Sequence, residues 1–262
     1  MTSLRARLDG WSDALACPTG SGVVHLRTLR RAVGLVAVGL PVALPVADGL
    51  RRALLRVVGV GDGWVERSIS AYFHTGVREL FVGSLCAIAV FLVCYRGYER
   101  RDDLAANVAG VCALVVALFP THERPTTMPD SGARAPDSVT LFSDAATPDP
   151  GFVGTVHFAA AALFFVTLAA MSLVLFTRSD QTVPTPQKRR RNRVYVLCGV
   201  TILACIALIA VGKLLAGEAF EARTHFVFWL ESVAVVAFGV SWLTKAQTVL
   251  ADDGDDSAAS SR

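Results

Sequence analysis

The side chains best suited to chemistry in this sequence are three histidines and one acid: His74, His157, His225 and Glu231. Imidazole is the commonest metal ligand in proteins, and three protein ligands can hold Zn²⁺ while one coordination position stays open. The sequence therefore suggests a zinc site at His74, His157 and His225. No two of these histidines have the i, i+4 spacing of an HExxH or HxxxH site. The alternative is a set of ordinary histidines where apolar and polar surroundings meet.

Glu231 is the acid that lies deepest within an apolar stretch. A carboxylate in such a place either takes up a proton or finds a partner. Lys213 is a candidate partner, and an ion pair between the two would be structural. Six helical residues at 100° each separate His225 and Glu231 by about 120°, so they do not share a helix face. His225, Trp229 and Ser232 do share one.

A polar pattern precedes the second long apolar stretch. Glu66, Ser70, His74 and Arg78 recur at every fourth residue of the segment 66–79. If this segment is helical, the four side chains form one polar stripe, in which Arg78 and His74 would bind a lipid phosphate. The alternative is the wet face of a helix that lies at a membrane surface.

The elements that must position these residues are long, uncharged blocks. Apolar residues make up 53% of the 262 residues, and the blocks mostly lack the polar face of a soluble helix. A bilayer core about 30 Å thick needs about 20 helical residues. The sequence therefore predicts an all-α bundle of six transmembrane helices, the first of which Pro41 and Pro45 would kink. The predicted spans are 32–50, 79–95, 104–120, 152–176, 194–215 and 225–243.

Lysine and arginine set the orientation of this bundle. The run Lys188–Arg193 abuts the fifth span and should stay in the cytoplasm. Both termini are then cytoplasmic, in a multi-pass protein of the plasma membrane. The predicted divisions are a cytoplasmic tail at 1–31, the transmembrane domain at 32–245 and a disordered acidic tail at 246–262. Three aromatic residues fall at inner helix ends, as an interfacial belt would place them: Tyr95, Tyr195 and Trp242.

Small residues also recur in the spans. Ala106 and Gly110 are four residues apart, which lets helices approach closely and favours a compact bundle. The six cysteines include no CxxC pair, so they are interpreted as small buried hydrophobes. The sequence does not fix the oligomeric state.

Six short stretches carry a resemblance to a group of uncharacterised prokaryotic six-span integral membrane proteins, the DUF998-like group. They are Ser68–Thr75, Arg78–Gly83, Tyr95–Tyr98, Val116–Pro120, Gly154–His157 and Phe228–Glu231. The resemblance implies a helical bundle in the membrane. The chain is also similar, more faintly, to the alkaline ceramidase and adiponectin-receptor superfamily of seven-span zinc hydrolases. That similarity would give His74, His157 and His225 a zinc-hydrolase role, although the last predicted span lacks an HxxxH pair.

The favoured function is binding of membrane lipid or a small ligand in a polar pocket in the outer half of the bundle. His74, Arg78 and Glu231 are the candidate ligand-binding residues. Two alternatives stay open: a metal-dependent hydrolase or amidase acting on lipid with zinc as cofactor, and a small proton-coupled transporter in which Glu231 or a histidine carries the proton. The net charge of +3 gives no reason to expect a nucleic-acid partner.

Overall fold

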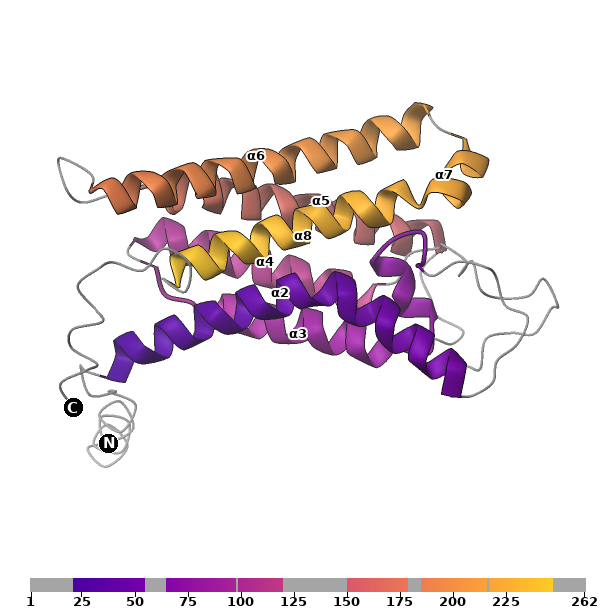
Figure 1. The fold of residues 1–262 in the computed structure, drawn as a ribbon, viewed down its shortest axis with the longest axis horizontal. Coiled ribbons are helices and arrows are strands. Elements are labelled where there is room, and N and C mark those ends of the chain that lie inside the picture. Colours follow the sequence, from indigo (N-terminus) through magenta and orange to yellow (C-terminus); the bar gives the residue numbers. More distant parts are fainter. Residues whose placement is uncertain are drawn as a thin grey trace, which may run out of the picture.

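The computed structural model describes residues 21–54, 65–97, 99–119, 150–178, 185–215 and 217–246. Every regular element in these ranges is helical, which confirms the all-α prediction (Figure 1). The elements are α2 (Ser21–Leu54), η1 (Ser70–His74), α3 (Arg78–Cys94), α4 (Arg100–Leu118), α5 (Pro150–Ala170) with its π-helical continuation η2 (Met171–Leu175), α6 (Pro186–Leu215), α7 (Glu218–Thr224) and α8 (Phe226–Lys245). Of the predicted tails at 1–31 and 246–262, residues 1–20 and 247–262 lie outside the described residues, whereas residues 21–31 are helical and belong to α2.

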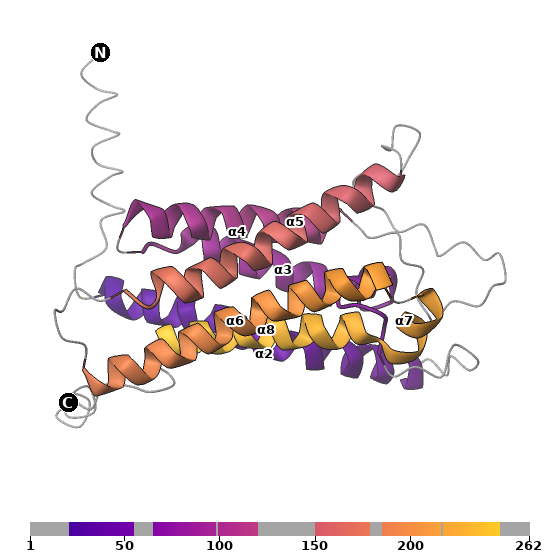
Figure 2. The same ribbon diagram turned by 90° about the horizontal axis from the view of Figure 1, so that it is seen from above.

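The long helices pack in chain order as a closed ring. Each of α2 to α6 packs against the next, α6 packs against α8, and α8 closes the ring against α2. Figures 1 and 2 show successive long helices running in alternating directions. The first residues of α2 and the last residues of α8 therefore lie at one end of the bundle. We call this the basic end, and the opposite end, where α2 finishes and α8 begins, the plug end.

Four helices are long and apolar enough to cross a membrane. They are Arg27–Leu54, Phe152–Leu175, Pro186–Leu215 and Phe226–Lys245. α3 has only 17 residues, and α4 carries four charged residues in its first turn. Neither helix is therefore among the four that are long and apolar enough to cross a membrane. Both nevertheless pack in the ring beside the other four. The prediction of a helical membrane protein is thus supported by four helices.

The outer surface of the ring is apolar, as lipid-facing helices require. Leu35, Val42 and Val46 of α2 are each more than 60% exposed, and Leu197 and Leu214 of α6 are exposed as well. A soluble monomer rarely shows apolar faces of this extent. Figure 1 also shows α2 bending along its length, as expected of a helix that contains Pro41 and Pro45.

A close helix contact joins α2 to α8 through two glycines. A Cβ atom placed on Gly34 would lie 2.9 Å from the carbonyl oxygen of Gly239, and one on Gly239 would lie 2.8 Å from that of Gly34. Gly110 of α4 makes a similar contact with the carbonyl oxygen of Ala89 in α3, and Ala106 is fully buried. These contacts agree with the compact packing expected from small residues.

The aromatic residues at the basic end differ from the prediction. Tyr95, Tyr195 and Trp242 are at most 2% exposed and therefore form no belt facing lipid. Tyr95 and Phe176 both contact Trp242 edge to face, with ring centroids 5.1 and 5.7 Å apart. The interior of the bundle buries them, and their rings pack with Phe176 between α6, α8 and the residues that follow α3 and η2.

The glycine contact between α2 and α8 is testable by substitution. We expect Gly34→Ala to lower the free energy of unfolding by about 1–3 kcal/mol, because the new methyl group must displace the α8 backbone. Gly39→Ala, on the same helix, is the matched control, since a Cβ there has nothing within 4 Å. That control should be neutral or stabilising by up to about 1 kcal/mol. Thermal unfolding in detergent measures both, and equal melting temperatures would contradict the proposed contact.

Candidate functional site

Residues 65–77, which we call the plug, fold into the plug end of the bundle between α2, α3 and α8. The segment contains the short 3₁₀-helix η1, in which Ser70 and Tyr72 are buried. The backbone N–H of Phe228, in the first turn of α8, donates to the carbonyl oxygen of Arg67 at 2.9 Å. The rings of Tyr72 and Phe228 also approach to 6.3 Å between centroids. The plug is therefore bonded to α8 through both backbone and side chains.

The structure of segment 66–79 differs from the single helical stripe that the sequence predicted. The backbone is a 3₁₀-helix followed by a turn, and α3 begins only at Arg78. Glu66 and Ser70 are buried, whereas His74 and Arg78 are half-buried. The four side chains consequently do not share one wet face.

Glu231 fixes the start of η1. Its Oε2 atom accepts a hydrogen bond from the backbone N–H of Ile69 at 2.6 Å. Beside it, the Ser68 hydroxyl accepts the N–H of Ala71 at 3.1 Å. Backbone donors at a helix start have no partner within the helix and favour a nearby negative charge. Lys213, a candidate partner of Glu231 in the sequence, donates to Glu221 of α7 at 2.6 Å.

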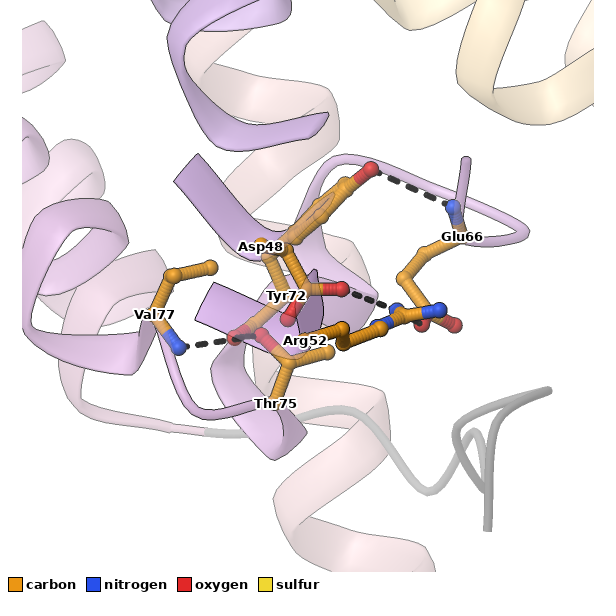
Figure 3. Close-up of polar contacts among 6 residues, drawn as sticks. All are labelled: Asp48, Arg52, Glu66, Tyr72, Thr75 and Val77. Atoms are coloured by element: carbon orange, nitrogen blue, oxygen red, sulfur yellow. Dashed lines mark hydrogen bonds and ion pairs between the residues drawn. The ribbon is translucent and has the colours of Figure 1, made fainter. Parts of the chain in front are cut away.

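Two further acids meet one arginine beneath the plug (Figure 3). Arg52, in the last turn of α2, forms ion pairs with Asp48 one turn earlier and with Glu66 of the plug, the latter at 3.3 Å. Asp48 is 3% exposed and Glu66 is fully buried. Buried carboxylates are costly unless paired, so Arg52 joins the plug to α2. We call Asp48, Arg52, Glu66 and Glu231 the acidic cluster.

Tyr72 packs under this cluster, and its hydroxyl accepts the backbone N–H of Glu66 at 3.3 Å (Figure 3). Burial raises the pKa of Tyr72 above its ordinary value of 10.0, and the nearby charges of Glu66 and Asp48 raise it further. The bond from Glu66 N–H and the charge of Arg52 act in the opposite direction. The phenol therefore stays protonated in the folded protein over the whole neutral range.

The rim of the plug is basic. The guanidinium of Arg78 lies 4.2 Å from the centre of the Phe73 ring, and the His74 ring meets Phe73 edge to face at 5.3 Å. The guanidinium of Arg51 occupies the space where a side chain at position 76 would lie, so this position accommodates only Gly76 without a shift. Figure 3 shows the adjacent turn, in which Thr75 Oγ1 accepts the N–H of Val77 at 3.4 Å. We call Arg51, His74 and Arg78 the rim.

The other two predicted metal ligands occupy different surroundings. His157 is 3% exposed, and its Nδ1 atom hydrogen-bonds the carbonyl oxygen of Phe119 at 2.6 Å, which joins α5 to the end of α4. His225 links α7 to α8 in the left-handed backbone conformation, with φ of 49°. Across the described ranges, no three histidine, cysteine or acidic side chains are placed to hold a metal ion. His74, His157 and His225 thus do not fit a shared zinc ion.

Sequence reasoning overlooked Asp48, Arg52 and Tyr72. The i, i+4 spacing of Asp48 and Arg52 was a usable signal, because it places opposite charges on one helix face. Their link to Glu66 depends on how the plug folds back, and no local pattern encodes that.

The acidic cluster predicts a charge-dependent loss of stability. Arg52→Met should lower the free energy of unfolding by about 3–5 kcal/mol, because it leaves two buried carboxylates without their cation. Adding Asp48→Asn and Glu66→Gln to that variant should restore much of the loss, since the two carboxylates that Arg52 pairs with are then replaced by neutral amides. Chemical unfolding in detergent at pH 7 measures the series. A triple variant as unstable as Arg52→Met would show that the charges are not responsible.

The raised pKa of Tyr72 predicts that the stability of the protein falls at high pH. A proton held more tightly in the folded than in the unfolded state makes stability fall once the pH passes the unfolded pKa, here about 10. The wild-type protein should therefore lose stability above pH 10 more steeply than Tyr72→Phe, with the two curves parallel below pH 9. Melting temperatures across this range provide the measurement, and parallel curves throughout would contradict a raised pKa.

Comparison with known proteins adds no assignment to this geometry: no family model, no curated protein and no solved structure matches the chain.

Proposed function

We propose that this chain is a six-span integral protein of the plasma membrane, with both termini in the cytoplasm, whose rim binds the phosphate headgroup of an anionic lipid. In this proposal α3 and α4 complete the six spans, and the plug end faces outward. We include in this proposal that the chain belongs to the DUF998-like group, which its sequence resembles. The four apolar helices and the alternating directions of the ring support it.

The observation that carries the lipid-binding function is the approach of Arg51 and Arg78 to nearby residues of the plug, Gly76 and Phe73. Arg51 reaches the turn at Gly76 from α2, while Arg78 is held over Phe73 at the start of α3. Two guanidinium groups and an imidazole around one turn supply donors suited to phosphate oxygens.

The surroundings of the rim favour a lipid over a soluble anion. Next to Arg51, Leu50 and Leu54 are 58% and 73% exposed, and next to Arg78, Leu80 is 38% exposed. Cations beside exposed apolar side chains match a ligand that carries a charged headgroup on acyl chains. The acidic cluster has a supporting role, because Glu231 and Glu66 hold the plug against α8 and α2.

Direct measurements distinguish the two other function classes, a zinc-dependent hydrolase and a proton-coupled transporter, from lipid binding. A zinc-dependent hydrolase requires stoichiometric zinc in the purified protein that is lost in His157→Ala. A proton-coupled transporter requires flux in proteoliposomes that disappears in Glu231→Gln. The bond from Glu231 to the Ile69 backbone favours a structural role for this acid, and glutamine would keep its acceptor oxygen.

The rim predicts a selective effect on lipid affinity. Arg51→Gln and Arg78→Gln should each weaken binding of phosphatidylglycerol about fivefold, which corresponds to about 1 kcal/mol for each cation near a phosphate. Gly76→Ala should have a similar but smaller effect, since the methyl group displaces the flexible end of Arg51. Native mass spectrometry of the detergent-solubilised protein with added lipid measures the affinities.

Arg223→Gln is the matched control, because this arginine is exposed on α7 at the same end of the bundle. It should leave the affinity unchanged. Equal affinities for phosphatidylglycerol and phosphatidylcholine, or equal losses in the rim and control variants, would overturn the proposed function.

A further inference from the structure

The first two turns of α6 present a basic face at the basic end of the bundle. Arg189, Arg190 and Arg193 are exposed. Their neighbours turn toward the bundle, with Lys188 half-buried and Arg191 9% exposed. Arg193 follows Arg189 by four residues and Arg190 by three, so the three exposed guanidinium groups lie on one side of the helix. We call Arg189, Arg190 and Arg193 the α6 basic face.

This face lies where a helix favours acids. The positive end of the helix dipole is at the N-terminus, yet α6 begins at Pro186 with no acidic residue in its first turn. Like charges three or four residues apart on a helix also repel each other. The positive-inside rule explains why cations gather at this end of the bundle, but it removes neither cost. An anionic partner that lies across the face lowers both.

The chain carries an acidic segment that follows α8. The segment comprises residues 252–256, which lie outside the described residues, and four of its five residues are aspartates. They are Asp252, Asp253, Asp255 and Asp256. The face from Arg189 to Arg193 covers about 6 Å of helix, so a segment of five residues is long enough to extend along it. The acidic segment therefore complements the α6 basic face in charge and in length.

The end of α8 lies beside the start of α6. The ammonium of Lys245, the last residue of α8, lies 5.2 Å from the centre of the Phe176 ring. Lys188, in the first turn of α6, donates to the carbonyl oxygen of the same Phe176 at 3.0 Å. Asp252 is six residues beyond Ala246, and six extended residues span up to about 20 Å. That length is sufficient to bring the acidic segment to the α6 basic face.

We propose that the acidic segment binds across the α6 basic face and ties the end of α8 to the start of α6. A tether this short gives the two groups an effective concentration on the order of millimolar, so ion pairs that are weak one by one are sufficient together. Anionic lipid headgroups at the adjoining membrane surface are the competing occupants. The segment is favoured because it brings four carboxylates on one tether, whereas a phosphatidylglycerol headgroup brings one charge.

The test replaces one arginine of the face by lysine, which keeps the charge, and hence the membrane orientation, and adds an amine. A carbodiimide then joins that amine to a carboxylate in contact with it, and mass spectrometry of peptides identifies the joined residues. In the full chain, Arg190→Lys should be linked to the acidic segment with about fivefold higher yield than Arg101→Lys. Arg101, exposed in the first turn of α4, is the matched control, because α4 begins at the same end of the bundle but does not adjoin α8 in the ring.

Two conditions show what holds the segment and what competes with it. At about 1 M salt, where the Debye length is about 3 Å, the yield for Arg190→Lys should fall by about threefold or more. In phosphatidylglycerol nanodiscs the cross-link should persist. A cross-link that forms in detergent and disappears in these nanodiscs would overturn the proposal, because lipid headgroups would then occupy the face.

Equal yields for Arg190→Lys and Arg101→Lys would also overturn the proposal, since the tether alone would then bring the segment to any cation at this end. Melting temperatures equal to that of the wild type confirm that both variants fold. If Arg190→Lys melts early, Arg189→Lys and Arg193→Lys test the same face. Arg78→Gln at the rim should leave the cross-link unchanged, which separates failure of this proposal from failure of lipid binding at the rim.

Discussion

The whole arrangement depends on one constraint: a polar group within an apolar bundle must find its partner inside the protein. Lipid cannot hydrogen-bond a backbone, so non-helical chain is tolerated only where the protein itself supplies the partners. The plug is such a chain. Its Ile69 N–H bonds the Glu231 carboxylate, its Arg67 carbonyl accepts from Phe228, and its Glu66 pairs with Arg52. Glu231, an acid that is costly in an apolar helix, is thus one of the groups that hold the plug in place.

The two ends of the bundle hold their charged side chains against the protein in different ways. At the plug end, the buried carboxylates of Asp48 and Glu66 pair with the guanidinium of Arg52, and the half-buried Glu231 accepts a backbone N–H, so these charges hold the plug in place. At the basic end, the cations of Arg30, Lys188 and Lys245 lie over the rings of Tyr95, Tyr195 and Phe176. The first arrangement joins the plug to α2 and α8, and the second holds the ends of α2, α6 and α8 against aromatic rings of the bundle interior.

The sequence predicted the helical class because long apolar blocks in lipid have few alternatives to helix, and four helices confirm it. The sequence also indicated that Glu231 is unusual and offered Lys213 as a candidate partner, but a search among charged residues does not find the backbone N–H of Ile69. It expected a helical stripe at 66–79, where a period of four is equally compatible with an irregular segment that buries Glu66 and Ser70. The fold of the plug depends on contacts more than 100 residues apart, such as Ile69 with Glu231, and no local pattern contains them.

The helix pair α2 and α8 connects these features. α8 carries Glu231 near its start and Lys245 at its end, while α2 carries Arg30 near its start and Arg52 at its end. Because the two helices run in opposite directions, both ends of the bundle take charged residues from α2 and α8. Their backbones touch at Gly34 and Gly239, where no side chain separates them. A slip of one helix along the other by one turn, about 5 Å, would move Glu231 away from the plug and Lys245 away from Arg30 together. The glycine contact therefore sets the register on which both ends depend.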